Sequence, residues 1–261
     1  MGDYFREFRH FDAYAQQAQS IADFLASWIN GPLACFADIG SNSGSLAEKV
    51  LPLLKGGGMC YATEPGTRAF ASLRQRFHSR QDVQLDNLLF EGWLEKYRDE
   101  LHDKVDLLLN SHTFYHFPKD SWRYLIDRGS RLLNPGGSHV IILDSDKTSV
   151  NELKGAVEEK FDRALGGKRA YGKFLFGRKL QEFFEDEKIP YQKHFINHPI
   201  TIPAGEESME HFARILGFMI RYDAVDLLMF AAEDMEKYMA LHEASGIYSF
   251  PGVQEVFVLK K

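Results

Sequence analysis

Short apolar runs alternate with amphipathic stretches along the first half of the chain. Nearly continuous apolar runs are typical of buried strands, whereas apolar residues three or four positions apart are typical of helices. After a helical section at about 10–30, the pattern predicts strands at 34–39, 59–64, 88–91, 105–110 and 138–143. The helices predicted between them are 45–54, 67–78, 94–101 and 119–132. Strands and helices that alternate in this way form a parallel sheet with helices on both faces.

The pattern changes beyond Leu143. Helices are predicted at 149–166 and 174–187, and two more strands at Tyr191–Ile200 and Val253–Leu259. Between these strands, from about 206 to 243, apolar residues recur at helical spacing. They are Phe212, Ile215, Leu216, Met219, Val225, Leu228, Met229, Met235 and Met239. Such a methionine-rich stripe belongs to a core more often than to a ligand site, although methionine-rich surfaces do adapt to varied ligands.

The turn after the first strand is the first candidate for a functional site. The strand ends near Asp38, and the helix near Ser45 follows a turn of glycine, serine and asparagine. Gly40 and Gly44 would let the backbone approach a ligand, toward which the free N–H groups of the helix would point. The dinucleotide fingerprint Gly-x-Gly-x-x-Gly would need glycine in place of Asn42 and Ser45, which excludes that class. Similar turns without ligands are common, so a purely structural turn remains an alternative.

The second strand ends in an acidic residue whose spacing from this turn is typical of nucleotide-binding sites. Glu64, in the sequence Glu64-Pro65-Gly66, follows Gly44 by 20 residues. In a nucleotide-binding βαβ unit, an acidic residue at that place accepts hydrogen bonds from the ribose hydroxyls. Glu64 is therefore predicted to hold a ribose. The alternative is an exposed acidic residue beside the N-terminus of the next helix.

Composition narrows the choice of partners. With 261 residues and 44% hydrophobic content, the chain can bury a sizeable core. Its net charge of −6, without a Lys/Arg run, argues against nucleic acid as a partner. Cys35 and Cys60 form no CxxC pair, which suggests buried, reduced thiols in a cytoplasmic protein. The N-terminus is charged and aromatic and no uncharged stretch reaches ~18 residues, so we expect neither secretion nor a membrane partner.

The two turns carry a resemblance to a known family. The sequence from Asp38 to Gly44 reads Asp-x-Gly-x-x-x-Gly, which resembles the first motif of class I S-adenosylmethionine-dependent methyltransferases, with Asn42 at the place of the middle glycine. The turn Asn134-Pro135-Gly136-Gly137 is similar to the one that leads into the fifth strand of that class. The resemblance implies S-adenosylmethionine as cofactor. It implies cofactor contacts from Asp38, Gly40, Ser41, Asn42, Gly44, Glu64, Pro65, Trp93, Leu94, Asn110 and Ser111.

The same resemblance implies a fold and a domain organisation. The fold would be α/β, with a Rossmann-like seven-stranded sheet, helices on both faces and an antiparallel last strand. Residues 1–30 would form a helical lid, and residues 31–205 the core that binds the cofactor. Residues 206–245 would form a helical insertion on the substrate side, and residues 246–261 the final edge strand.

The segment after the fourth predicted strand, 110–117, looks like the family's fourth motif, which contacts both the methionine part of the cofactor and the acceptor. Its histidines and tyrosine are chemically versatile, and His112 is the first candidate for acceptor contact or general base, with Tyr115 beside it. His112 could instead be a packed histidine, and His116 could simply begin the next helix. Trp93 stands where many members carry an acidic residue that contacts adenine, so its indole would either stack on adenine or belong to the core.

A narrower resemblance is to the histamine N-methyltransferases. They have a similar aromatic and basic opening, the glutamate-proline pair, a tyrosine in the fourth motif and a helical insertion before the last strand. Tyr4, Phe8 and Phe11 fall on one helical face. The resemblance implies that Tyr4 and Phe8 line the acceptor pocket, although this face could also anchor the helix to the core. The glutamate that binds the cationic amine in that family corresponds to neutral Gln17, so histamine itself is not the expected acceptor.

Together, these features predict a methyltransferase. It would move a methyl group from S-adenosylmethionine to a nitrogen or oxygen of a small molecule and release S-adenosylhomocysteine, with no metal. One alternative is a methyltransferase that acts on protein or RNA, for which a basic surface would be expected. Another is a protein of the same fold that binds the cofactor without methylating anything.

Overall fold

The computed structural model describes residues 12–148, 153, 157, 160, 177–220 and 224–261. Tyr4 and Phe8, the predicted acceptor aromatics, lie outside these residues, as does most of the predicted helix 149–166. The described residues fall into two compact units. One takes 12–17, those between 145 and 176, and those between 197 and 253; the other takes 18–144, 177–196 and 254–261. Each unit has a hydrophobic core of its own.

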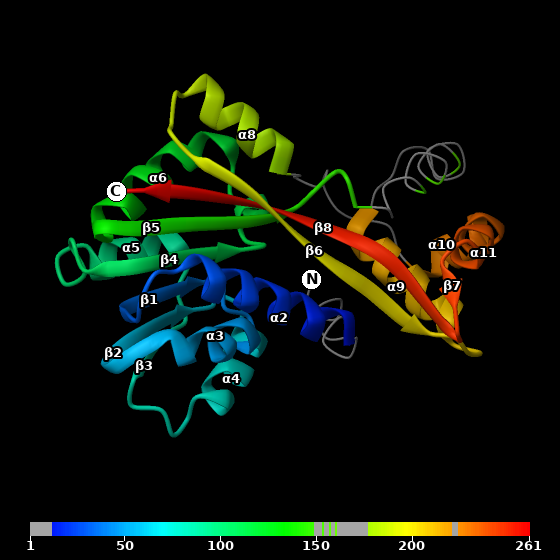
Figure 1. Cartoon of the computed structure of the whole chain (residues 1–261), viewed down its shortest axis with the longest axis horizontal. Coiled ribbons are helices and arrows are strands. Elements are labelled where there is room, and N and C mark those ends of the chain that lie inside the picture. Colours follow the sequence, from blue (N-terminus) through cyan, green and yellow to red (C-terminus); the bar gives the residue numbers. More distant parts are fainter. Residues whose placement is uncertain (1–11, 149–152, 154–156, 158–159, 161–176, 221–223) are drawn as a thin grey trace. The chain divides into compact units, whose positions relative to one another are not determined.

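The strands form one eight-stranded sheet (Figure 1). Its order is β3-β2-β1-β4-β5-β8-β6, with β7 paired to β8 off this path. Neighbours from β3 to β5 are parallel, and β8 pairs antiparallel with β5. The strands are β1 (Leu33–Ile39), β2 (Leu54–Thr63), β3 (Val83–Asp86), β4 (Val105–Ser111), β5 (Leu133–Asp144), β6 (Gln192–Pro203), β7 (Glu243–Ala244) and β8 (Ile247–Lys260). The predicted α/β fold with an antiparallel last strand is confirmed.

Helices bury both faces of the parallel strands. Phe36 of β1 packs in a cluster with residues of α2, α3 and α4, whereas Cys35 and Ala37 pack in a second cluster with residues of α5 and α6. Since successive residues of a strand point to opposite faces, β1 is covered on both sides. These helices are α2 (Asp12–Trp28), α3 (Ser45–Val50), α4 (Thr67–Arg76), α5 (Phe90–Tyr97) and α6 (Lys119–Leu132), and α8 (Gly177–Asp186) follows later in the chain.

Several predicted boundaries are wrong, and two of them have a clear physical reason. The strand predicted at 88–91 is instead the loop before α5 and its first turn, while the third strand is Val83–Asp86, paired with β2. The pattern missed it because this short edge strand mixes polar and apolar residues. The helix predicted to reach position 54 ends at Val50, because Pro52 lies in the 3₁₀ segment Leu51–Leu53 and has no N–H to continue an α-helix.

The predicted turn 134–137 lies inside the bounds of β5. Val105 of β4 pairs with Leu133, but Leu107 pairs with Ser138, so the register shifts between them. Gly136 has φ 88, in the left-handed region that favours glycine. The Pro-Gly-Gly sequence therefore forms an irregularity at the start of the strand, as bulges commonly do.

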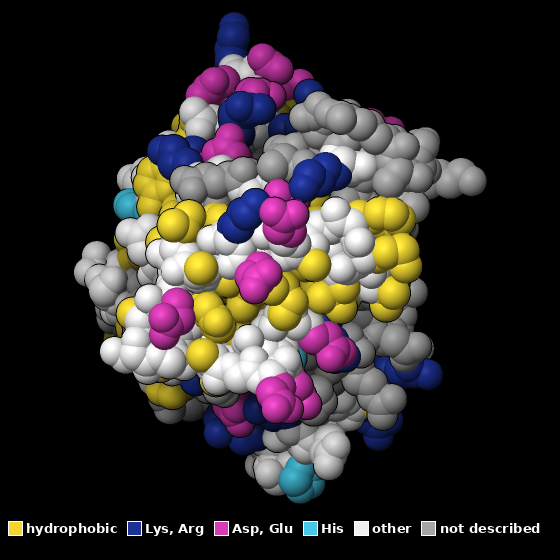
Figure 2. Space-filling model, turned by 90° about the vertical axis from the view of Figure 1, so that its right-hand side faces the viewer, with side chains coloured by type: hydrophobic (Ala, Val, Ile, Leu, Met, Phe, Trp, Pro, Cys, Tyr) yellow, Lys and Arg dark blue, Asp and Glu magenta, His cyan; other side chains and the backbone are white. Residues whose placement is uncertain are grey.

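The other unit contains the predicted helical insertion, as α9 (Ser208–Ile220), α10 (Ala224–Phe230) and α11 (Ala232–Ala240). The methionine-rich stripe divides there between core and surface. Met235 and Met239 are buried, whereas Val225 and Met229 are 65% and 67% exposed. Figure 2 faces the side on which α10, α11 and β7 lie and shows hydrophobic side chains gathered among acidic ones. Within the described part of the chain, no helix is long and apolar enough to cross a membrane.

Candidate functional site

The predicted site residues come from the carboxyl ends of neighbouring strands. The strand order reverses at β1, which pairs with β2 on one side and β4 on the other. In open α/β sheets, ligands bind outside the carboxyl ends of the strands at such a switch point. The turn after β1, Glu64 after β2 and the segment from Asn110 to Tyr115 at the end of β4 all lie at this edge. The structure thus brings together segments that the sequence predicted separately.

The backbone of the turn explains its unusual glycine pattern. The N–H groups of Gly40 and Ser41 both donate to the carbonyl oxygen of Thr63, over 2.8 and 2.9 Å. Gly40, Asn42 and Gly44 have φ values of 74, 52 and 80. Left-handed backbone is open to glycine and, among other residues, most readily to asparagine. Asn42 can therefore stand at this left-handed position of the turn, where only glycine is more readily accommodated.

The two glycines also allow close packing within the protein. A Cβ on Gly40 would collide with the methyl carbon of Thr113, which follows β4. A Cβ on Gly44 would lie 2.5 Å from Phe77 Cε2 and 2.7 Å from Leu73 Cδ1, at the end of α4. Both positions thus need glycine for protein contacts, whether or not a ligand approaches the turn.

Glu64 reaches the turn across the two strands. Its Oε2 accepts a hydrogen bond from the backbone N–H of Asn42 over 2.9 Å, and its Oε1 accepts one from Gly66 N–H over 2.7 Å. The side-chain amide of Asn87, which follows β3, donates to the carbonyl oxygens of Glu64 and Pro65, over 2.7 and 3.1 Å. The carboxylate is therefore held beside the turn, where a charge-assisted hydrogen bond is strong.

Asp38 is a buried carboxyl group beneath the same turn. It is 2% exposed, and burial raises its pKa to about 7; the negative charge of Glu64 adds to this, while a hydrogen bond with Ser41 opposes it. Its Oδ2 has no hydrogen-bond partner among the residues that the structure describes. Buried polar atoms are nearly always paired, so an orphaned oxygen at this place is suited to a donor group of a ligand.

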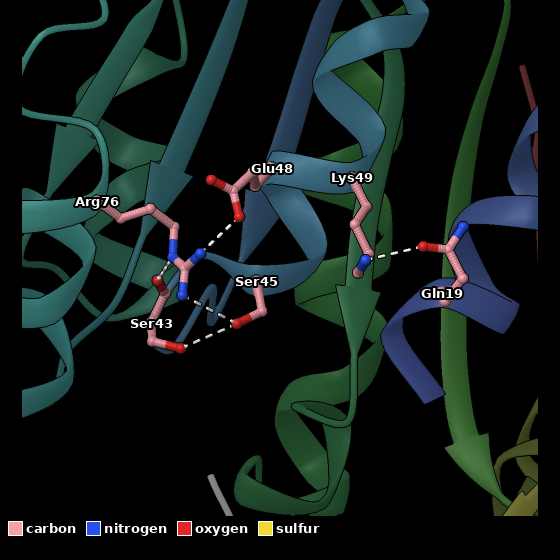
Figure 3. Close-up of polar contacts among 6 residues, drawn as sticks. All are labelled: Gln19, Ser43, Ser45, Glu48, Lys49 and Arg76. Carbon is pink, nitrogen blue, oxygen red and sulfur yellow. Dashed lines mark hydrogen bonds and ion pairs between the residues drawn. The ribbon is translucent and has the colours of Figure 1, made fainter. Parts of the chain in front are cut away.

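A side chain of α4 holds the outer side of the turn, as Figure 3 shows. Arg76 donates from Nε to the carbonyl oxygen of Ser43 over 2.7 Å, from Nη1 to Glu48 Oε2 over 2.5 Å and from Nη2 to Ser45 Oγ over 3.4 Å. Sequence reasoning missed Arg76, because no local pattern indicates that a residue 33 positions after Ser43 returns to its carbonyl group. This contact fixes the step from turn to helix.

His112 sits in a cluster of polar side chains where the ends of β4 and β5 meet the middle of β8. Its ring is 20% exposed, and Gln254 Nε2 of β8 lies 2.6 Å from His112 Nε2. On the other side, His112 Nδ1 lies 3.8 Å from Asp144 Oδ2 at the end of β5. Burial lowers the pKa of His112, against an opposite effect of Asp144. The ring of Tyr115 is 6.0 Å away between centroids, so the two predicted acceptor residues are neighbours.

Sequence reasoning missed Asp144 and Gln254. Asp144 is the last residue of β5. A polar residue at the carboxyl end of a parallel strand is a candidate site residue, so the sequence did contain a signal for it. Gln254 is fully buried in β8 and meets His112 from 142 positions away, so no local pattern indicates this contact. Both ring nitrogens of His112 therefore face protein side chains, an arrangement that fixes the orientation of the ring.

Trp93 and Leu94 lie in the core. They are 0% and 2% exposed and pack in the cluster with Cys35 and Ala37 of β1. The indole ring of Trp93 lies 5.1 Å from that of Tyr97 between centroids. This burial favours the core alternative for Trp93, and adenine stacking stays a prediction. The loop after β3 lies at the carboxyl edge of the sheet, where the turn after β1 also lies. In contrast to Trp93, Leu89 in this loop is 62% exposed.

Comparisons with known proteins identify the fold. No protein-family model and no curated protein matches the sequence. The chain is similar to a SAM-dependent methyltransferase structure from Archaeoglobus fulgidus, with a TM-score of 0.52, 11% identity and 94% of each chain covered. It is also similar to geranyl diphosphate methyltransferase in complex with SAM, with a TM-score of 0.51, 12% identity, and 92% of this chain and 84% of that one covered. The chain therefore has the Rossmann-like fold of these S-adenosylmethionine-dependent methyltransferases.

Proposed function

We propose that this protein is an S-adenosylmethionine-dependent methyltransferase that acts on a nitrogen or oxygen of a small molecule. The observation that carries the proposal is the carboxylate of Glu64 beside the turn after β1, bonded to the backbone of Asn42. A glycine turn alone has many uses. An acidic side chain from the next parallel strand, held at that turn at the switch point, is the arrangement that binds a ribose.

The residues present fit the cofactor. Glu64 would accept hydrogen bonds from the ribose hydroxyls, and the backbone of Gly40 and Asn42 would lie beside the methionine part. The orphaned Oδ2 of Asp38 would accept a hydrogen bond from its amino group. The bound cofactor supplies an electrophilic methyl group on a sulfonium, and the protein has to align the acceptor with that group and exclude water.

His112 and Tyr115 are the proposed acceptor residues. Burial lowers the pKa of His112, which favours a neutral imidazole near pH 7, and the ring held by Gln254 and Asp144 would contact the acceptor. The net charge of −6 supports a small molecule over nucleic acid. In the same proposal, the enzyme works in the cytoplasm.

Binding of S-adenosylhomocysteine tests the cofactor site. We expect the purified protein to bind it, and Glu64→Ala to raise the dissociation constant about 30-fold, because a charge-assisted hydrogen bond is worth about 2 kcal/mol. Isothermal titration calorimetry measures both. Glu185→Ala, a change of an exposed glutamate on α8, is the control and should leave the affinity unchanged. Equal affinities of Glu64→Ala and the unmodified protein would remove Glu64 from the site.

A further inference from the structure

A row of buried polar side chains connects the middle of β5 with the turn after β1. His139 of β5 is fully buried, and its Nε2 lies 2.7 Å from Asn110 Oδ1 at the end of β4. Asn110 is also fully buried, and its Nδ2 donates to Thr113 Oγ1 over 2.9 Å. The methyl group of Thr113 packs directly against Gly40 of the turn. The side chain of Asn110, predicted to bind cofactor, is therefore occupied by protein partners.

The hydrogen bonds of this row run in one direction. Burial lowers the pKa of His139 to about 3, so its ring is neutral and carries a single proton near pH 7. Because Asn110 donates to Thr113 with its amide nitrogen, its oxygen faces His139 and accepts a hydrogen bond from Nε2–H. His139 Nδ1 is then a bare acceptor without a partner in the described part of the chain. The opposite arrangement would bury an unpaired N–H, which proteins tolerate less well.

Close packing holds both ends of the row. Gly129 of α6 lies against the ring of His139, where a Cβ would be 3.4 Å from Nδ1 and 2.8 Å from Leu108 Cδ2. The absence of a side chain at 129 thus lets α6 cover the ring. At the other end, the space beside Gly40 is filled by Thr113. A change in the position of the ring would therefore displace the turn, since protein interiors are too densely packed for the shift to stay local.

We propose that His139 is a positioning residue for the cofactor turn, although it touches no part of the turn itself. It fixes the amide of Asn110, which orients Thr113, and Thr113 sets the place of Gly40. This inference rests on the proposed function, because the turn is the proposed binding site of S-adenosylmethionine. It assigns to β5 a part in cofactor affinity that the sequence did not suggest.

Two substitutions at the same position test the hydrogen bond. His139→Leu removes the donor, whereas His139→Gln places an amide N–H near the position of Nε2. We expect His139→Leu to raise the dissociation constant of S-adenosylhomocysteine about tenfold, the equivalent of one hydrogen bond. We expect His139→Gln to stay within about threefold of the unmodified protein, less than 1 kcal/mol. Thr113→Val, which removes the hydroxyl but keeps the branched shape, should act like His139→Leu and serves if that variant does not fold.

Nuclear magnetic resonance of the ligand-free protein provides a readout that does not depend on the cofactor. The Gly40 amide and the Thr113 methyl signals should shift in His139→Leu and return in His139→Gln. Leu180→Ala is the control, since this fully buried residue of α8 should lower stability without affecting these signals or the affinity. The inference is overturned if His139→Leu leaves both signals and affinity unchanged, or if Leu180→Ala weakens binding equally. Failure of the unmodified protein to bind would contradict the proposed function alone, because the signals still report whether His139 holds the turn.

Discussion

At Asp38, burial disfavours the charged form of the carboxyl group. Burial raises the pKa of this carboxyl group from its ordinary 3.8 to about 7. The folded protein therefore keeps a proton that the unfolded chain loses near pH 4. Asp38 thus contributes to stability below that pH, and its contribution is lost as the pH rises from ~4 to ~7. The carboxylate is present at neutral pH only in part, and a cationic ligand group would favour it.

Asp38→Asn should remove this pH dependence, since asparagine is neutral in both states. We expect the free energy of unfolding of the original protein to fall more steeply between pH 5 and pH 8 than that of Asp38→Asn, with a difference of about 2–3 kcal/mol. Urea unfolding of ligand-free protein at several pH values measures it. Parallel pH profiles of the two proteins would show that Asp38 titrates normally.

The residues of the site divide into those that a local pattern indicates and those that it does not. Asp38, Asn42 and Glu64 were predicted, because the spacing of a glycine turn and the next strand end is a short-range feature of one βαβ unit. Arg76, His139 and Gln254 were not. Each meets its partner across an interface between elements, and the sequence gives no sign of which side chains face each other there.

Among the elements, β6 and β8 are joined by a partly buried ion pair, against which α8 packs. Lys193 Nζ of β6 lies 2.9 Å from Glu255 Oε2 of β8, and Glu255 is only 2% exposed. Lys193 Nζ also donates to Gln181 of α8 over 2.6 Å and lies over the ring of Phe257, 5.3 Å from its centroid. Gly177, at the start of α8, leaves no room for a side chain beside Glu255. The carboxylate is therefore confined and has a cation within reach.

Lys193→Met should be destabilising, because it removes the cation that lies 2.9 Å from the buried carboxylate of Glu255. We expect the free energy of unfolding to fall by about 3–5 kcal/mol. The double variant Lys193→Met with Glu255→Leu should recover a large part of this loss, since replacing both charges by apolar groups is often close to neutral. Chemical denaturation of the three proteins distinguishes these cases. A double variant no more stable than the single one would mean that packing, not charge, dominates.

Strand boundaries were predictable where both faces of the strand are buried. The strands β1 and β4 are covered on both faces and have nearly continuous apolar runs, so their predicted bounds differ from the observed ones by a residue at each end at most. The edge strand β3 has an intermediate or exposed residue at three of its four positions and produces no such run. Of the apolar residues that led to the prediction of 88–91, Leu88 and Leu89 lie in the loop before α5, and the buried Phe90 begins that helix.

For the whole molecule, the alternation of strands and helices was enough to predict the fold class. The pairing of β5 with β8 joins Ser138 to Lys260, and only the resemblance to a family indicated that the last strand would return there in the antiparallel sense. The placement of most of 149–176 lies outside the described residues, so that part of the prediction has no outcome. The acceptor, which depends on the residues around the cofactor's methyl group, stays a proposal.

The overall charge leads to a prediction about the acceptor. A protein with a net charge of −6 and no Lys/Arg run repels polyanions, so methylation of RNA would be disfavoured. We expect methyl-labelled S-adenosylmethionine, incubated with the protein and a cell extract, to label the low-mass fraction. Heat-inactivated protein is the control. Label in the protein or RNA fraction would contradict the proposed acceptor class, and identification of the labelled small molecule would give the substrate.

The close approach of α6 at Gly129 has an evolutionary consequence. Because a Cβ there would lie 2.8 Å from Leu108 Cδ2, position 129 can gain a side chain only if position 108 shortens. The ring of His139 is the third member of this contact. During divergence the three positions are therefore expected to covary, since a single substitution at any of them passes through a less stable intermediate.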